Sequence, residues 1–266
     1  MARDRTLFDR SARDYDAARP GYPEQLIDVL LQRSGIPESG RILEIGAGTG
    51  QLTAPLAERG YRMVAIELGE NLSRLAAKNL DRYPNATVVC ADFEQYDVEP
   101  GAYDLVVSAQ AFHWIAPTIG YPKVYGALRP GGRFALVWNL FPGSDDRVYR
   151  DLDAAYRACA PQLCRAPGRR PLAEQVERIE RQIDASELFE PTDTVQVRWT
   201  SVYTTSRYLR LLRTYSDHLA LDPSTLGRLL ESVRSTLDRF GGTIDRPQIS
   251  TLFLARRKQD GAATGD

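Results

Sequence analysis

The stretch Arg41-Ile-Leu-Glu-Ile-Gly-Ala-Gly-Thr-Gly50 predicts a buried strand that ends in a glycine-rich loop. Its first half is a short apolar run, which is typical of a strand covered on both faces. Three glycines follow at alternate positions: Gly46, Gly48 and Gly50. Glycine adopts positive φ and lets the atoms of another molecule approach the backbone closely. Because a helical pattern starts near residue 50, the stretch predicts a nucleotide-type binding site at the carboxyl end of a strand.

An acidic residue at the end of the next predicted strand supports this interpretation. The apolar run 63–66 ends at Glu67, about 20 residues after the first glycine, where an acceptor for ribose hydroxyls is expected. Glycine fingerprints alone produce false positives, and the alternative is a tight turn that binds no ligand. The position of Glu67 favours the ligand-binding loop.

Composition and charge restrict the class of protein. Of the 266 residues, 43% are hydrophobic, which is enough for a substantial core. The chain has 34 basic and 35 acidic residues. This balance argues against nucleic acid as the main partner. Three cysteines favour a reducing compartment, the first residues lack the apolar core of a signal peptide, and no run approaches the ~20 apolar residues of a membrane span. We therefore expect a cytoplasmic protein with no membrane partner and no metal site; its oligomeric state stays open.

Beyond the glycine loop, strand and helix patterns alternate, which predicts an α/β fold with a parallel sheet and helices on both faces. Expected strands cover residues 61–67, 86–90, 103–107, 134–138, 194–203 and 248–255. Expected helices cover residues 70–80, 117–128, 145–160, 172–188, 205–220 and 223–240. Right-handed crossovers place the loops that follow the strands along one edge of the sheet.

Four motifs in order carry a family resemblance: residues 43–50, Glu67, Asp92-Phe93 after the third strand, and residues 128–132 before the fifth. Between about residues 20 and 140 the chain resembles the class I S-adenosylmethionine-dependent methyltransferases. Residues 15–16, 19–23 and 110–114 look like the small-molecule branch that includes trans-aconitate methyltransferases. The resemblance implies a Rossmann-like sheet of about seven strands with an added helical cap after strand five. It also implies S-adenosyl-L-methionine as cofactor, S-adenosyl-L-homocysteine as product, and a small-molecule acceptor with an oxygen, nitrogen or carbon nucleophile.

The resemblance also assigns the cofactor contacts. Glu67 is expected to accept hydrogen bonds from both ribose hydroxyls, Asp92 to accept one from the adenine amino group, and Phe93 to pack on the adenine ring. The full expected set is Tyr15, Arg19, Glu44, Gly46, Ala47, Gly48, Thr49, Gly50, Glu67, Leu68, Asp92, Phe93, Ser108, Ala109 and Gln110.

The acceptor is expected to meet residues from the end of the core and from the cap. His113 is the candidate general base, and the alternative is a histidine that only packs beside Trp114. The stretch 204–221, which contains the expected helix over 205–220 with its apolar face, is expected to roof the pocket, although such a face is also the ordinary signature of core packing. The expected acceptor-binding set is Tyr22, His113, Trp114, Trp138, Asn139, Tyr208, Tyr215 and His218.

The expected domain organisation follows from these assignments. Residues 1–23 form a lid that closes over the cofactor, and residues 24–141 form the Rossmann-like cofactor-binding core. Residues 142–258 supply the helical cap and the last two strands, and residues 259–266 form a disordered tail.

Three other functions remain open. A nicotinamide-dependent oxidoreductase also uses a glycine loop and a ribose acid, but its glycines fall at the first, third and sixth positions, and the chain has no Tyr-x-x-x-Lys pair. A nucleic-acid methyltransferase of the amino-methylating kind would carry Asn/Asp-Pro-Pro-Tyr where residues 108–111 read Ser-Ala-Gln-Ala. A protein that binds the cofactor without transferring its methyl group is the third.

Overall fold

The computed structural model describes residues 7–164 and 172–259, which fold into two compact units. The sheet unit comprises Gly21–Asn139, Ala173–Val197 and Ser250–Asp266. The helical unit comprises Met1–Pro20, Leu140–Leu172 and Arg198–Ile249.

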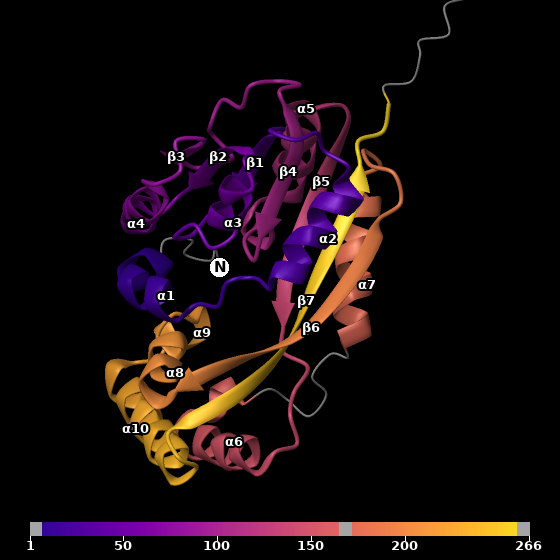
Figure 1. Ribbon diagram of the computed structural model, residues 1–266. Helices are drawn as coiled ribbons and strands as arrows, with labels where there is room; N and C mark the ends of the chain where they lie inside the picture. The colour runs from indigo at the N-terminus through magenta and orange to yellow at the C-terminus, as the bar shows by residue number, and fades with distance from the viewer. Residues whose placement is uncertain (1–6, 165–171, 260–266) are drawn as a thin grey trace, which may run out of the picture. The chain divides into compact units, whose positions relative to one another are not determined.

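A seven-stranded sheet in the order β3-β2-β1-β4-β5-β7-β6 organises the chain (Figure 1). The five strands from β3 to β5 pair in parallel, so their carboxyl ends share one edge. This topology confirms the α/β fold expected from the sequence. The strands are β1 (Arg41–Ile45), β2 (Arg62–Glu67), β3 (Ala86–Cys90), β4 (Tyr103–Ala109), β5 (Leu128–Leu140), β6 (Asp193–Thr204) and β7 (Thr243–Arg256).

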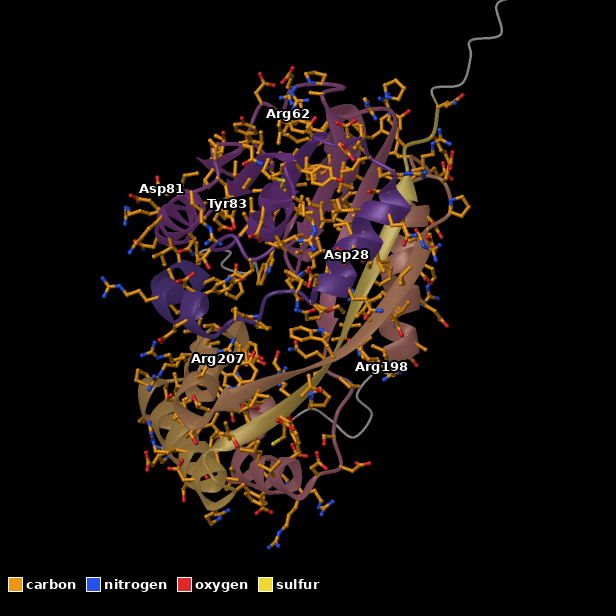
Figure 2. All side chains as sticks on the ribbon, in the orientation of Figure 1. Asp28, Arg62, Asp81, Tyr83, Arg198 and Arg207 are labelled. Atoms are coloured by element: carbon orange, nitrogen blue, oxygen red, sulfur yellow. The ribbon has the colours of Figure 1, made fainter. Side chains whose placement is uncertain are left out.

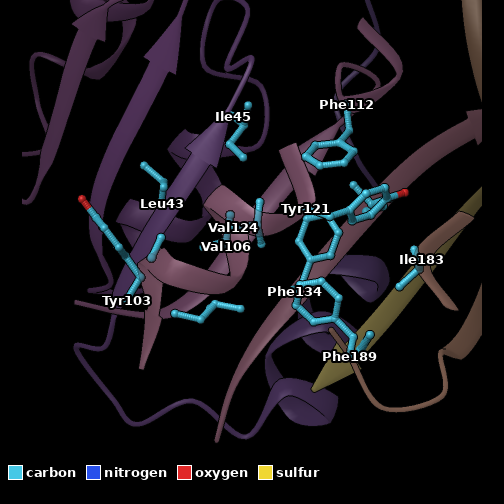
Figure 3. Packing of buried hydrophobic residues seen from close by; sticks show 14 of the residues in the cluster. Leu43, Ile45, Tyr103, Val106, Phe112, Tyr121, Val124, Phe134, Ile183 and Phe189 are labelled. Carbon is cyan, nitrogen blue, oxygen red and sulfur yellow. The ribbon is translucent and has the colours of Figure 1, made fainter. Parts of the chain in front are cut away.

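Alternate residues of the central strands serve two separate cores, one on each face of the sheet. Leu43 and Ile45 of β1 point into a cluster that helices α5 (Pro117–Ala127) and α7 (Leu172–Asp184) cover, shown in Figure 3. Ile42 points the other way, into a cluster that helices α2 (Glu24–Ser34) and α3 (Thr53–Glu58) cover. Because both faces are covered, the strands are apolar almost throughout.

Further helices complete the sheet unit. Helix α4 (Glu70–Leu80) packs on β2 and β3, and the short 3-10 helix η2 (Phe112–Trp114) follows β4. On the surface, Asp28 of α2, labelled in Figure 2, pairs with Arg59 just beyond α3 at 3.0 Å. Such an exposed pair contributes little, so the apolar faces of α2 and α3 hold them to the sheet.

Residues 128–132, expected as a turn before strand five, belong to β5 itself. Tyr103 of β4 pairs with Leu128 and Leu105 pairs with Arg133, so β5 accommodates extra residues as a bulge. Gly131 has φ +79° inside it, a conformation that glycine adopts without strain. The Pro-Gly-Gly sequence, expected as a turn before the strand, therefore forms a bulge inside it.

The helical unit has its own core. Helices α1 (Ala12–Ala18) and α8 (Thr205–Leu212) contact each other, and α10 (Pro223–Arg239) packs on α6 (Arg147–Cys159) and α8. Asp222 caps α10 because its carboxylate accepts hydrogen bonds from the first backbone N–H groups of the helix. The unit also contains 3-10 helices η1 (Leu7–Ser11) and η3 (Pro161–Leu163) and the short helix α9 (Ser216–Leu219).

The expected single helix over residues 205–220 was wrong. Helix α8 ends at Leu212, and α9 begins only at Ser216. Arg19 binds the segment between the two helices: its Nε donates to the Thr214 hydroxyl at 2.8 Å, and its Nη2 donates to the Thr214 carbonyl at 2.7 Å. Hydrophobic spacing alone did not reveal this partner, which lies 195 residues away in the sequence.

The two units divide the chain differently from the expected ranges. Residues Ala173–Val197, expected in the cap, belong to the sheet unit, and β6 and β7 each have residues in both units. Of the expected lid, the residues to Pro20 belong to the helical unit, and its closure over the cofactor stays a prediction. The expected disordered tail lies almost wholly outside the described residues. No helix within residues 7–164 and 172–259 is long and apolar enough to cross a bilayer.

The contacts of Arg19 predict a stability effect without any ligand. Arg19→Met should lower the free energy of unfolding by ~1.5–3 kcal/mol, the usual contribution of hydrogen bonds to a charged group. Arg13→Met, an exposed arginine of α1, is the matched control and should change stability by no more than ~0.5 kcal/mol. Urea denaturation of the unliganded protein measures both. Equal effects of the two substitutions would show that the bonds of Arg19 to Thr214 do not stabilise the fold.

Candidate active site

Glu67 at the carboxyl end of β2 is held by two backbone N–H groups. The N–H of Gly48 donates to its Oε2 at 2.8 Å, and the N–H of Gly69 donates to its Oε1 at 2.9 Å. The residue is only 8% exposed, so these charge-assisted bonds fix the carboxylate between the loops after β1 and β2. Carboxylate oxygens accept more than one hydrogen bond each, so Glu67 keeps the capacity to accept further hydrogen bonds.

The glycine loop takes its shape from backbone conformation and from one close contact. Gly46 has φ +73°, and a methyl group on it would lie 2.3 Å from the side chain of Ala111. Gly48 has φ +61° and turns its N–H towards Glu67. Asn79 of α4 donates to the Thr49 carbonyl at 2.9 Å and holds the far side of the loop. Ala47 and Thr49, expected in the cofactor set, are buried within the loop.

Glu44 lies on β1 just before the loop and is almost fully buried. Its Oε2 accepts a hydrogen bond from the Thr53 hydroxyl of α3 at 2.6 Å. Burial raises the pKa of Glu44 to about 8, with the Thr53 bond opposing and the nearby charge of Glu67 adding to the rise. At neutral pH Glu44 is therefore largely protonated, and it supports the loop through Thr53. Its expected contact with the cofactor stays a prediction.

Asp92 lies in the loop after β3, where its carboxylate already accepts a hydrogen bond from the backbone. Asp92 Oδ1 accepts from the backbone N–H of Glu94 at 3.0 Å, which orients the side chain in a tight turn. Phe93 is 4% exposed and belongs to the core on the α5 face, with the Lys123 amino group 5.4 Å from its ring centroid. Its expected packing on an adenine ring stays a prediction. Leu68, after Glu67, is partly buried.

The residues after β4 carry backbone strain. Gln110 has φ +61°, unusual for a residue with a side chain, and its N–H donates to the Val137 carbonyl at 2.9 Å. Such strain is characteristic of functional sites. The Ser108 hydroxyl donates to the Ile45 carbonyl at 2.8 Å, so its side chain ties β4 to β1. Ala109 is buried at the end of β4.

Three aromatic residues meet beyond this turn. The ring of His113 lies 5.1 Å from that of Trp114 and 6.5 Å from that of Trp138, between ring centroids. His113 is exposed, whereas both tryptophans are partly buried. Asn139, next to Trp138, accepts a hydrogen bond from the Ser250 hydroxyl and donates to the Gly21 carbonyl at 3.3 Å. The rings of His113, Trp114 and Trp138 thus lie together, and Asn139, the next residue of β5, contacts Gly21, which precedes Tyr22 on the α2 face of the core.

The remaining expected residues belong to the helical unit. Arg19 lies over the rings of Tyr15 and Tyr215, 5.1 and 4.9 Å from their centroids, besides its bonds to Thr214. Tyr208 is buried on α8. These residues form one group among themselves, and the contacts expected between the Tyr15–Arg19 pair and the cofactor stay predictions.

His218 is buried with both ring nitrogens engaged. Nδ1 lies 2.7 Å from Asp217 Oδ1, and Nε2 lies 2.7 Å from the hydroxyl of Tyr156. If Nδ1–H donates to Asp217, Nε2 accepts a hydrogen bond from the Tyr156 hydroxyl. Burial, foremost, holds the pKa of Tyr156 above its ordinary value. His218 therefore orients Tyr156, and a direct contact with an acceptor stays a prediction.

Three residues that shape these sites were not identified from the sequence: Thr53, Asn79 and Tyr156. Thr53 and Asn79 could have been suspected, because polar residues inside the first helices after a binding loop need a partner. No local pattern marks Tyr156, since its partner His218 lies 62 residues away along the chain.

Glu44 predicts a pH-dependent stability. Below pH 4.5 the carboxyl is protonated in both states, and between pH 4.5 and about 8 only the unfolded chain releases the proton. Stability therefore falls as the pH rises through this window, by ~1.4 kcal/mol for each pH unit. Glu44→Gln removes this titration. The difference in free energy of unfolding between the variant and the parent should therefore rise by a few kcal/mol, in favour of the variant, from pH 4.5 to 8 in denaturant titrations.

Glu58→Gln, at an exposed position of α3, is the control. A difference in stability between Glu44→Gln and the parent that does not change with pH would contradict a protonated Glu44.

Known proteins share this architecture. A family model described as a methyltransferase domain matches residues 42–132. Over 237 residues the chain is 30% identical to uncharacterized methyltransferases of Mycobacterium bovis and Mycobacterium tuberculosis, covering 88% of this chain and 87% of theirs. A 160-residue stretch is 34% identical to malonyl-[acyl-carrier protein] O-methyltransferase of Geobacter sulfurreducens, covering 58% of this chain and 57% of that protein.

The solved structure of a candidate type II methyltransferase from Anaeromyxobacter dehalogenans superposes with a TM-score of 0.59 at 25% identity, covering 90% of this chain and 96% of that one. The chain belongs to the class I S-adenosylmethionine-dependent methyltransferases.

Proposed function

We propose that this methyltransferase transfers the methyl group of S-adenosylmethionine to a small-molecule acceptor. The observation that carries the proposal is the Glu67 carboxylate, fixed by the N–H groups of Gly48 and Gly69 at the edge where the parallel strands end. The near-neutral net charge disfavours a nucleic-acid acceptor. Similarity to a malonyl-[acyl-carrier protein] O-methyltransferase supports an acceptor of metabolic origin. The resemblance to trans-aconitate methyltransferases stays a prediction.

The residues at this edge fit the cofactor. Glu67 would bind the ribose hydroxyls, the loop from Gly46 to Gly50 would let the methionine end pass close to the backbone, and Asp92 would accept from the adenine amino group. When bound, S-adenosylmethionine supplies a methyl group on a sulfonium, which the acceptor nucleophile takes by in-line displacement. The chain's task is to align the two partners and to keep water away from them.

His113 is the residue best suited to move a proton. An acceptor that arrives as a hydroxyl must lose its proton during transfer, and an imidazole ring nitrogen can accept that proton. The contacts with Trp114 and Trp138 limit the orientations of the ring while leaving it exposed. An acceptor that arrives ionised needs no base, and His113 would then only orient it.

Removing the charge of Glu67 tests the cofactor site. Glu67→Gln keeps the shape but weakens the bonds to the ribose diol, so affinity for S-adenosylhomocysteine should fall by ~1.5–3 kcal/mol in calorimetry. Glu70→Gln, an exposed residue of α4 paired with Arg74, is the matched control and should bind as the parent does. Transfer of a radiolabelled methyl group to candidate acceptors separates an enzyme from a protein that only binds the cofactor. Tight binding of NADH, or equal affinities in both variants, would overturn the assignment.

Substitution of His113 tests the proton-transfer role. His113→Ala should lower kcat by ~10²–10⁴-fold if the imidazole is the base, and the pH–rate profile should lose its lower limb. His113→Gln, which can still donate and accept hydrogen bonds, distinguishes orientation from proton transfer. A loss below tenfold with an unchanged pH profile would assign His113 to packing.

A further inference from the structure

The Pro-Gly-Gly bulge of β5 forms one side of a cavity that the proposed function does not use. The cavity has a volume of about 360 Å³. The described residues that line it are Pro130, Gly131, Arg256, Arg257, Lys258 and Gln259, all of which belong to the sheet unit. Three of these lining residues are cationic and none is acidic, so the cavity attracts anions.

This cavity lies at the edge of the sheet opposite to Glu67. Strand β5 begins at Leu128, and the N–H of Arg257, just after β7, donates to the Gly132 carbonyl at 2.9 Å. The end of β7, yellow in Figure 1, therefore lies beside the start of β5. Glu67 instead lies at the carboxyl ends of the parallel strands, and a strand of seven residues such as β4 extends over about 20 Å. The cavity is therefore a site of its own, separate from the cofactor edge.

The two arginines of the cavity are held by contacts with the bulge and with α5. The guanidinium of Arg257 lies 4.3 Å from the ring centroid of Tyr125, and its Nη1 donates to the Leu128 carbonyl at 2.6 Å. Arg256 lies against Gly131, since a Cβ on that glycine would be 3.4 Å from its Nη2. These contacts limit the orientations of both side chains, so a ligand that binds them has less side-chain entropy to remove.

The third cation is held by a neutral acceptor. Lys258 Nζ donates to the Glu187 carbonyl at 2.7 Å, which positions the ammonium group without neutralising its charge. The carboxylate of Glu190 lies 4.0 Å from Nη1 of Arg256, beyond hydrogen-bond distance, and the two side chains are 46% and 41% exposed. Such an exposed pair is weak, so Glu190 leaves Arg256 able to bind an anion from solution.

A phosphate monoester has the charge and the acceptors that this arrangement requires. Near neutral pH it carries close to two negative charges on three acceptor oxygens, which suits several cations better than a single charge does. An arginine donates two parallel hydrogen bonds to phosphate, and lysine adds a point charge. The volume is within the ~300–1,000 Å³ of ligand sites, so there is room for a body attached to the phosphate. Gln259 lines the cavity and no aromatic residue does, so that body is hydrophilic.

We propose that this cavity binds the phosphate monoester of a small hydrophilic metabolite, such as a sugar phosphate. Arg256 and Lys258 bind the phosphate group together with Arg257, and the bulge at Gly131 lets Arg256 lie against the backbone. The site adds a second ligand to the cofactor and the acceptor of the proposed function, and it does not depend on either of them.

Titration of the ¹⁵N-labelled full chain with glucose 6-phosphate and ribose 5-phosphate tests the proposal. The corresponding sulfate esters, which carry one negative charge instead of two, and inorganic phosphate are the comparison ligands. All are measured at ~0.15 M ionic strength, where attraction by distant surface charges is screened. At least one phosphate ester should bind saturably, at least ~10-fold more tightly than its sulfate ester and than inorganic phosphate. It should shift the amide resonances of Gly131 and Gly132.

Variants of the cavity and one control locate the site. Arg256→Met should reduce the affinity for that ester at least ~10-fold, Lys258→Met at least ~3-fold, and Arg256→Lys by an intermediate factor because it keeps the charge but loses the fork. Arg62, labelled in Figure 2, is the control: it is exposed at the start of β2, on the same edge of the sheet, and its Nε donates to the Ser39 carbonyl at 3.0 Å. Arg62→Met removes a positive charge from this edge but none from the cavity, so affinity should change no more than about twofold.

Failure of both phosphate esters to bind would overturn the proposal, as would saturable binding that leaves Gly131 and Gly132 unchanged. Equal affinities for phosphate and sulfate esters, or equal losses in Arg256→Met and Arg62→Met, would show a general attraction of anions and would also overturn it. Amide spectra of the unliganded variants show whether each one is folded, and Lys258→Met decides the test if Arg256→Met is not. Because neither cofactor nor acceptor is used, the result is independent of the proposed function.

Discussion

Two backbone N–H groups on one carboxylate connect the loops that follow β1 and β2. Gly48 and Gly69 each donate to a different oxygen of Glu67, so the acid, the glycine loop and the start of α4 are fixed together. Positive φ at Gly48 directs its N–H towards the acid, and Asn79 holds the opposite side of the loop. The positive φ of Gly48 therefore serves to orient the Glu67 carboxylate, because it directs the donating N–H towards that acid.

A second acid beneath the loop makes this arrangement electrostatically feasible. Two ionised carboxylates in one buried region would repel each other, and the raised pKa of Glu44 leaves it largely neutral while it accepts from Thr53. On the other side of the loop, Ala111 fills the space that a side chain on Gly46 would need, and the strained Gln110 sets its position. The shape of the glycine loop therefore depends on the turn after β4 as well.

The sequence was sufficient for the sheet and for the position of the acid, because both follow from local apolar runs and from spacing. Strand β3 covers the residues predicted for it, and Glu67 closes β2 as expected. Contacts between distant parts of the chain were not predictable in this way. Hydrophobic spacing over 205–220 predicted one helix, but the chain forms α8 and α9, and Arg19, far away in sequence, binds Thr214 between them. Likewise nothing near Tyr156 identifies His218 as its partner, since only folding brings the two residues together.

Within the sheet unit, recognition of the cofactor through the Glu67 carboxylate is the central claim. The amide resonances of Gly48 and Gly69 report on it directly, because both N–H groups donate to the carboxylate that would receive the ribose hydroxyls. Titration of the ¹⁵N-labelled protein with S-adenosylhomocysteine should shift both resonances along one saturating curve, together with those of the turn after Asp92. Saturable binding that leaves Gly48 and Gly69 unchanged while perturbing other residues would contradict the claim.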